Sequence, residues 1–270
     1  MPGPETNPET KPEKSPAPSA TTPTGATPTG ATPTPAAGPP PSHRATRRFG
    51  AGGVIIDLDG TLLDTAADLA AAMNATLAEL GRSALAVEQV ARYVGKGAEV
   101  LVHRALTGRV DGRAGAAQFE PAMRAFLSHY RRENGRSARL YPGVREGLEA
   151  MRDKRLRLAV VTNKPAAFTV PLLAMTGIAE FFGLVVSGDT VARKKPDPMP
   201  MRHVCERFGL PPQRMVAIGD SMNDAIAARA AGIPVMAVPY GYNEGLEVQA
   251  LDVDAIVATL FEASALIDPA

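Results

Sequence analysis

The chain has 270 residues, of which 45% are hydrophobic and 21% charged, an ordinary composition for a soluble protein. Its formal net charge of +1 creates no field that would attract nucleic acid, and no apolar run reaches the ~18–20 residues of a membrane span. The single cysteine, Cys205, cannot form an internal disulfide, which fits a reducing compartment. We therefore expect a cytoplasmic protein that binds neither nucleic acid nor membranes.

Residues 1–48 differ in composition from the rest of the chain. They contain more than half of the 25 prolines, mixed with Thr, Ala, Ser and Gly, and no large aliphatic or aromatic residue lies between Met1 and Phe49. Such a segment cannot bury enough apolar surface to offset the entropy of ordering its backbone. The composition predicts a disordered arm with polyproline II character, and it identifies no partner for that arm.

From residue 52 onward, apolar strands alternate with amphipathic helices. The expected strands are apolar on both faces, which is typical of parallel strands buried inside a sheet; they span residues 54–56, 156–161, 184–186, 215–218 and 234–238. The expected helices between them span residues 144–154, 166–175, 200–208 and 221–231. This alternation predicts the α/β class, with a doubly wound parallel sheet.

Only helical periodicity is found between residues 65 and 140. Three apolar stripes at helical spacing run through residues 69–80, 98–106 and 119–130, and a capping-box pattern, Thr65-x-x-Asp68, precedes the first. An all-helical insertion directly after the first strand indicates a second, smaller domain. We expect an α/β core at 52–64 and 141–268, interrupted by a helical cap domain at 65–140.

Asp57 and Asp59 follow the first expected strand, at the sheet edge where α/β proteins bind ligands. Residues i and i+2 of an extended segment point to the same side, so both carboxylates can face one site. Two adjacent carboxylates repel each other, which favours a bound cation or a shared proton. A calcium loop is excluded, because Leu62 and Leu63 stand where further oxygen ligands are needed.

Three further strand ends carry polar residues suited to the same site. Thr162 and Asn163 follow one strand and offer a hydroxyl and backbone N–H groups to phosphate oxygens. Lys195 lies in a proline-rich loop, and Asp220 and Asp224 are one helical turn apart after another strand. Each feature alone is weak evidence, but together they predict one site at the carboxyl edge of the sheet.

In this order, the motifs resemble those of the haloacid dehalogenase superfamily, and the insertion resembles its helical cap. The motifs are Asp57-x-Asp59-x-Thr61, Thr162, Lys195 and Gly219-Asp220-Ser221-x-x-Asp224. Longer segments are similar to the proteobacterial phosphoglycolate phosphatases, namely residues 93–101, 161–165, 194–198 and 240–243. The resemblance covers residues 52–265. Lys96 departs from that family, in which Asn is frequent at this position.

The resemblance implies a role for each matching residue. Asp57 would attack phosphorus and form an aspartyl phosphate, and Asp59 would act as general acid and then general base. Mg²⁺ would be held by Asp57, the Asp59 carbonyl and Asp220, while Asp224 would orient waters or Lys195. Phosphate-binding roles are implied for Thr61, Thr162, Asn163 and Lys195. In the cap, Gly95-Lys96-Gly97 is expected to bind the carboxylate of the substrate.

The resemblance favours hydrolysis of a small phosphate monoester, with 2-phosphoglycolate as the first candidate. A dehalogenase would need neither a metal nor a second acid, so Asp59 and Asp220 argue against it. A phosphatase or mutase for a sugar or amino-sugar phosphate stays open, because its core motifs are alike. An inactive scaffold presented by the arm is disfavoured, because both Asp57 and Asp59 are present.

Overall fold

The computed structural model describes residues 47–270, so the expected arm lies outside the described residues except for Arg47 and Arg48. A parallel six-stranded sheet has the order β6-β5-β2-β7-β8-β9. Its strands are β2 (Gly53–Ile56), β5 (Arg157–Val161), β6 (Leu184–Val186), β7 (Met215–Gly219), β8 (Val235–Ala237) and β9 (Ala255–Ile256). The central strand β2 is paired on both sides, with Ile56 beside Val160 of β5 and Ile218 of β7.

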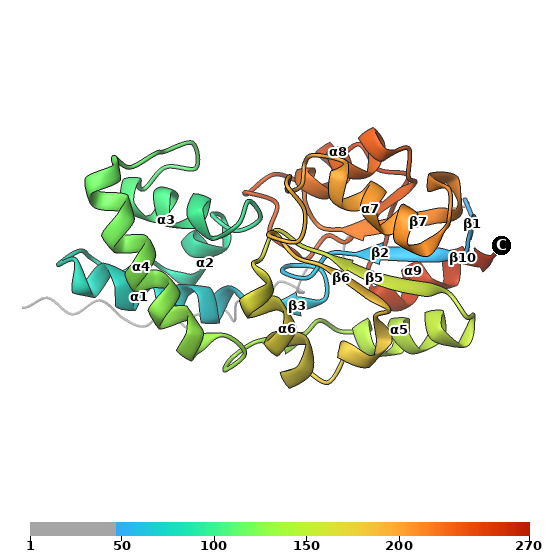
Figure 1. Cartoon of the computed structure of the whole chain (residues 1–270), viewed down its shortest axis with the longest axis horizontal. Helices are drawn as coiled ribbons and strands as arrows, with labels where there is room; N and C mark the ends of the chain where they lie inside the picture. The colour runs from blue at the N-terminus through green and yellow to red at the C-terminus, as the bar shows by residue number, and fades with distance from the viewer. Residues whose placement is uncertain (1–46) are drawn as a thin grey trace, which may run out of the picture. The chain divides into compact units, whose positions relative to one another are not determined.

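Helices cover both faces of this sheet (Figure 1). On one face lie α5 (Val144–Asp153), α6 (Ala166–Met175) and α9 (Leu260–Leu266), and on the other lie α7 (Met199–Phe208) and α8 (Met222–Ala231). Successive residues of β2 pack into different cores: Val54 and Ile56 face α5, α6 and α9, whereas Ile55 faces α7 and α8. A strand buried on both sides cannot be amphipathic, which explains its uniformly apolar sequence. The predicted doubly wound sheet is confirmed.

The helical cap between β2 and β5 comprises α1 (Ala66–Glu79), α2 (Val87–Ala91), α3 (Ala98–Thr107) and α4 (Ala116–Glu133). It has a hydrophobic core of its own, built from residues such as Met73, Leu101 and Phe126. Phe168 of α6 and Tyr242, which follows β8, pack into that core from the α/β core. Helix α2 was not predicted, because five residues are too few to show a helical period.

Two chain crossings join the cap to the α/β core, and β3 (Leu63–Asp64) pairs antiparallel with β4 (Arg139–Leu140) there. The predicted capping box at Thr65 and Asp68 is wrong. Thr65 makes no side-chain cap; its hydroxyl donates to Asp59 Oδ1 at 2.6 Å. Asp68 instead accepts the backbone N–H groups of Gly135 and Ser137, each at 2.7 Å. Both side chains therefore stabilise the segments that connect the cap to the α/β core, and neither caps the helix.

The two ends of the described chain pair with each other. Strand β1 (Phe49–Ala51) lies parallel to β10 (Ile267–Pro269), with Phe49 beside Ile267. Both of these side chains are buried in the sheet domain, so ordered structure begins before residue 52, where the sequence placed the start of the core. Short 3₁₀ turns complete the fold, at η1 (Ala179–Phe181), η2 (Pro212–Arg214) and η3 (Val248–Ala250). Within residues 47–270, no helix combines the length and apolarity that crossing a membrane requires.

Candidate active site

Asp57 lies directly beyond the carboxyl end of β2. Its Oδ1 accepts the Leu58 N–H at 2.7 Å and lies 2.8 Å from the ammonium nitrogen of Lys195. The chain turns sharply at Gly60, where φ is +89°, and a Cβ there would come within 2.3 Å of Asp220 Oδ2. The turn therefore requires glycine, because the backbone has a positive φ and because a Cβ would clash with the carboxylate of Asp220.

Lys195 is buried among anionic and carbonyl oxygens. Its Nζ contacts Asp57 Oδ1 at 2.8 Å, Asp224 Oδ1 at 2.6 Å and the Val161 carbonyl at 2.7 Å. Burial lowers the pKa of Lys195, but attraction to Asp224 and Asp57 outweighs it, so the net pKa lies above the ordinary value. The lysine therefore stays charged beside Asp57.

Asp224 is held at the start of α8. Its Oδ2 accepts the Ser221 N–H at 3.2 Å, which is one half of a capping box, and it also accepts the Ser221 hydroxyl at 2.7 Å. Its Oδ1 is taken by Lys195. Both oxygens of Asp224 are therefore engaged, one by Ser221 and the other by Lys195.

Asp220, at the end of β7, is also held on both oxygens. Oδ1 accepts the Thr61 hydroxyl at 2.8 Å, and Oδ2 accepts the Tyr242 N–H at 2.5 Å. Thr61 was expected to bind phosphate, but in the structure its hydroxyl donates its hydrogen bond to Asp220. Burial raises the pKa of Asp220 well above its usual range, and the charges of Asp224 and Asp57 raise it further.

This cluster of carboxylates fits a hard divalent cation. Oxygens of Asp57, Asp220 and Asp224 lie within 4.8 Å of one another, and Lys195 is the cation that contacts this group of three carboxyls. Burial, followed by repulsion from Asp224, raises the pKa of Asp57 to about 7 despite the nearby lysine. Among residues 47–270, no N–H donates to the Asp59 carbonyl, so this oxygen is also available. A bound cation would offset the repulsion.

Asp59 pairs with a lysine that the sequence analysis did not single out. Asp59 Oδ1 accepts the Thr65 hydroxyl at 2.6 Å and the Lys164 ammonium at 2.8 Å. Burial of the Lys164 side chain lowers its pKa, but attraction to Asp59 and the hydrogen bond to it outweigh that effect, so the net pKa is raised. Its position in the sequence could have indicated this role, because Lys164 lies two residues after Thr162 at the same strand end.

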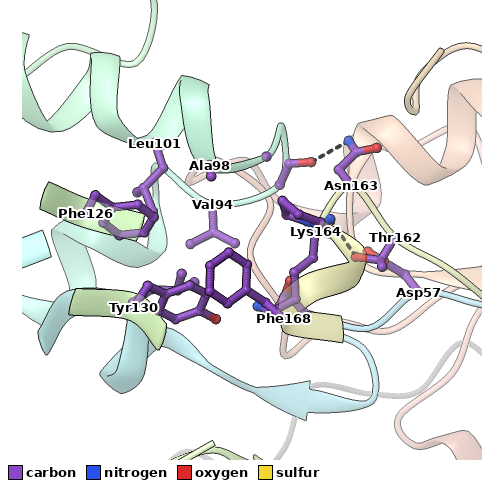
Figure 2. Close-up of a pocket in the computed structure, with 15 residues that line it drawn as sticks. Asp57, Val94, Ala98, Leu101, Phe126, Tyr130, Thr162, Asn163, Lys164 and Phe168 are labelled. Carbon is purple, nitrogen blue, oxygen red and sulfur yellow. Dashed lines mark hydrogen bonds and ion pairs between the residues drawn. The ribbon is translucent and has the colours of Figure 1, made fainter. Parts of the chain in front are cut away.

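Thr162 and Asn163 occupy the loop after β5. The Thr162 hydroxyl oxygen accepts the Lys164 N–H at 3.1 Å, which leaves its proton free to be donated. Asn163 donates from Nδ2 to the Gly95 carbonyl at 2.9 Å (Figure 2) and to the Lys195 carbonyl at the same distance. Asn163 therefore links the cap loop to the loop that carries Lys195.

A cavity lies between these groups and the cap (Figure 2). Polar residues line its core end, and its cap end is lined largely by apolar side chains, namely Leu69, Val94, Ala98, Leu101, Phe126 and Phe168. Gly95 and Gly97 also line it, as does Tyr130. Burial raises the pKa of Tyr130 to about 12, although Lys164 lowers it in part, so the hydroxyl stays neutral.

The structure does not bring Lys96 into this cavity. Its ammonium instead lies 2.9 Å from Glu244 Oε1, an oxygen that also accepts Arg104 Nη2 at 2.8 Å. The Lys96 side chain is 40% exposed, whereas that of Arg104 is buried. Burial raises the pKa of Glu244, but hydrogen bonds from Lys96 and Arg104 lower it more, so the carboxylate is ionised.

An aspartate pair after the first strand of a parallel sheet, a buried lysine beside it and an inserted helical cap define a class of hydrolases. The haloacid dehalogenase-like hydrolase family model matches residues 54–238, and the chain belongs to this family.

Within that family, proteins named phosphoglycolate phosphatase are similar in sequence. The protein from Nitrosospira multiformis is 54% identical over 79% of this chain and 94% of its own. That from Thiobacillus denitrificans is 48% identical over 80% of this chain and 96% of its own. A crystal structure described as a predicted phosphoglycolate phosphatase, from Haemophilus somnus, has a TM-score of 0.75 and 32% identity, covering 80% of this chain and 97% of that one.

Proposed function

We propose that this protein hydrolyses 2-phosphoglycolate to glycolate and phosphate. The observation that carries the proposal is Asp57, placed 2.8 Å from a buried lysine and two residues before a second carboxylate at the mouth of a capped cavity. The substrate is suggested by the names of relatives that are 54% and 48% identical.

The residues can divide the reaction into two displacements. In the first, Asp57 forms a bond to phosphorus as the ester oxygen leaves, and Asp59 gives that oxygen its proton. In the second, Asp59 takes a proton from water, whose oxygen attacks the aspartyl phosphate and releases phosphate. Hydrogen bonds from Thr65 and Lys164 to one oxygen of Asp59 leave the other oxygen for these proton transfers.

We propose Mg²⁺ as the metal of this site. Asp57, Asp220 and the Asp59 carbonyl would hold it, and it would supply positive charge that lets an anionic nucleophile approach an anionic ester. Lys195 and the Thr162 hydroxyl would bind the phosphoryl oxygens, where most of the stabilisation of phosphoryl transfer arises. Thr61 contributes through Asp220, whose carboxylate it orients. A cytoplasmic location stays a prediction from the sequence.

The rival substrate class, sugar or amino-sugar phosphates, is disfavoured by the cap end of the cavity. Sugar hydroxyls need several hydrogen-bonding partners, and an unpaired buried polar group costs about 1–3 kcal/mol. The cap side of the cavity offers mainly aliphatic and aromatic side chains. A small substrate leaves fewer polar groups to satisfy there.

Phosphate release from a panel of esters tests this proposal. We expect 2-phosphoglycolate to have a higher kcat/KM than glucose 6-phosphate or glucosamine 6-phosphate, EDTA to abolish activity, and Mg²⁺ to restore it. Asp57→Asn should reduce kcat by at least about 10³-fold while the fold is retained, because an amide cannot form the acyl phosphate. Faster turnover of a sugar phosphate would refute the substrate, and full activity in Asp57→Asn would refute the nucleophile.

A further inference from the structure

The proposed substrate places two anionic groups in one small cavity. Lys195, Thr162 and the metal site account for the phosphate, but 2-phosphoglycolate also carries a carboxylate one carbon away from the ester oxygen. Burying that carboxylate without a partner would be strongly unfavourable. The partner must come from groups that line the same cavity, and most of its cap end is apolar.

Tyr130 of α4 provides a hydrogen-bond donor at this end. The residue is 2% exposed, and its hydroxyl has no hydrogen-bond partner among residues 47–270. Its ring packs against Phe126 and Phe168, with centroids 5.4 and 4.7 Å apart, so the hydroxyl is held in place. A buried hydroxyl without a partner is costly, which indicates that a ligand completes its hydrogen bonding.

Lys164 lines the same cavity, and its ammonium lies over the Tyr130 ring. Its Nζ is 5.0 Å from the centre of the Tyr130 ring and 2.8 Å from Asp59 Oδ1. An ammonium can donate three hydrogen bonds, and Asp59 accepts one of them. The remaining donors can bind a substrate anion. A cation and a neutral donor side by side are suited to a carboxylate.

We propose that Tyr130 and Lys164 together form the subsite that binds the carboxylate of the substrate. The Gly95-Lys96-Gly97 loop contributes shape to the cavity, while the Lys96 ammonium pairs with Glu244 outside it. The substrate class is therefore a phosphate ester with a carboxylate close to the ester oxygen. This inference rests on the proposed phosphatase function and identifies how that site selects its substrate.

The test compares 2-phosphoglycolate with its neutral amide, 2-phosphoglycolamide, which has the same shape without the charge. In Tyr130→Phe, we expect KM for 2-phosphoglycolate to rise by about tenfold and KM for the amide to change less than about threefold. Lys164→Met should lower kcat for both substrates, because Asp59 loses its partner, and should also lower the preference for the acid over the amide.

Tyr93→Phe is the matched control. Tyr93 is another buried tyrosine of the cap, but its hydroxyl meets Gln89 Nε2 at 3.2 Å, and it is not among the residues that line the cavity. We expect this variant to keep the wild-type preference for the acid. Thermal melts of all variants check the fold.

Equal effects of Tyr130→Phe on both substrates would overturn the proposal. A second result would also overturn it: Lys96→Ala loses the preference for the acid over the amide, while Tyr130→Phe and Lys164→Met keep it. The carboxylate would then be bound by the cap loop. Failure of the proposed function looks different, since wild-type protein would then turn over sugar phosphates faster than 2-phosphoglycolate. If the wild type prefers 2-phosphoglycolate to sugar phosphates and Tyr130→Phe still prefers the acid to the amide, only the proposed subsite is refuted.

Discussion

The carboxyl groups of Asp57, Asp220 and Asp224 lie together at the carboxyl edge of the sheet, and one lysine, Lys195, pairs with Asp57 and Asp224. Their burial is unfavourable unless a proton or a metal ion joins them, and the pKa of Asp57, raised to about 7, reflects that cost. The same arrangement that makes Asp57 costly to ionise groups oxygen atoms of the kind that a divalent cation prefers.

This arrangement predicts a pH dependence of metal stabilisation. In metal-free protein, folded Asp57 keeps its proton up to a pH of about 7, whereas unfolded Asp57 loses it near 3.8. Because the folded state then holds more protons, stability should fall as pH rises between these two values. Bound Mg²⁺ replaces that proton, so the increase in Tm on adding Mg²⁺ should be larger at pH 8 than at pH 5.

Thermal melts with EDTA and with Mg²⁺ at both pH values measure this effect. Asp57→Asn should reduce the difference, because an amide has no proton to lose. Asp111→Asn, an exposed carboxylate paired with Arg109, should leave it unchanged. An Mg²⁺-induced shift that is the same at pH 5 and pH 8 would contradict the assignment of the cluster as the metal site.

At the scale of elements, polar contacts join the cap to the α/β core at several points. Asn163 reaches the cap loop at Gly95, and Glu244, in the loop after β8, binds both Arg104 of α3 and Lys96. Arg104 also donates to the carbonyls of Tyr93 and Val110 within the cap. Glu244 is therefore the residue of the α/β core that partners a buried cap guanidinium.

We expect Glu244→Gln to loosen the cap. It removes the charge that faces buried Arg104, which keeps its two carbonyl partners, so the free energy of unfolding should fall by about 1–3 kcal/mol. KM for the substrate should rise more than kcat falls, because closure positions the cavity wall while Asp57 is untouched.

Denaturant unfolding and steady-state kinetics check this prediction. Glu133→Gln is the control, since Glu133 pairs with Arg136 on the exposed surface of the cap, where such pairs contribute about 0–1 kcal/mol. Equal losses of stability in the two variants would show that Glu244 is an ordinary surface charge.

At the scale of the molecule, the first described residues belong to the folded domain. Arg47 and Arg48 pair with Asp254 and Asp268 at 2.8 and 2.7 Å, and Phe49 is buried beside β10. The composition of residues 1–46, by contrast, offers nothing that could build a core. The chain therefore changes character at about residue 47.

Two truncations that differ by only five residues test this boundary. Removing residues 1–46 should leave Tm and kcat nearly unchanged. Removing residues 1–51 deletes β1 and the buried Phe49 ring, and should cost about 3–5 kcal/mol of stability. Similar melting curves for the two truncations would mean that β1 contributes nothing, and a large loss in the first would mean that the arm stabilises the folded domain.

The sequence alone determined the elements and the edge at which the site lies. Buried parallel strands are apolar throughout and the helices between them are amphipathic, so local patterns were enough to place β2, β5, β6, β7 and β8 within a residue or two. Parallel strands end at a common edge, which is why Asp57, Thr162 and Asp220 could be expected together. Short elements such as α2 and β9 have no period and were not predicted.

Only the tertiary structure decided which polar side chains meet. Lys164 and Asp59 are 105 positions apart, and Glu244 reaches Arg104 across 140. No local pattern records the direction of a side chain across such separations. Lys96 fitted a cap loop that binds a carboxylate, yet it pairs with Glu244, and the unpartnered hydroxyl in the cavity belongs to Tyr130. The sequence predicts where phosphate binds, because that prediction follows from the ends of strands, whereas the group that we propose to select the substrate depends on how the cap packs on the core.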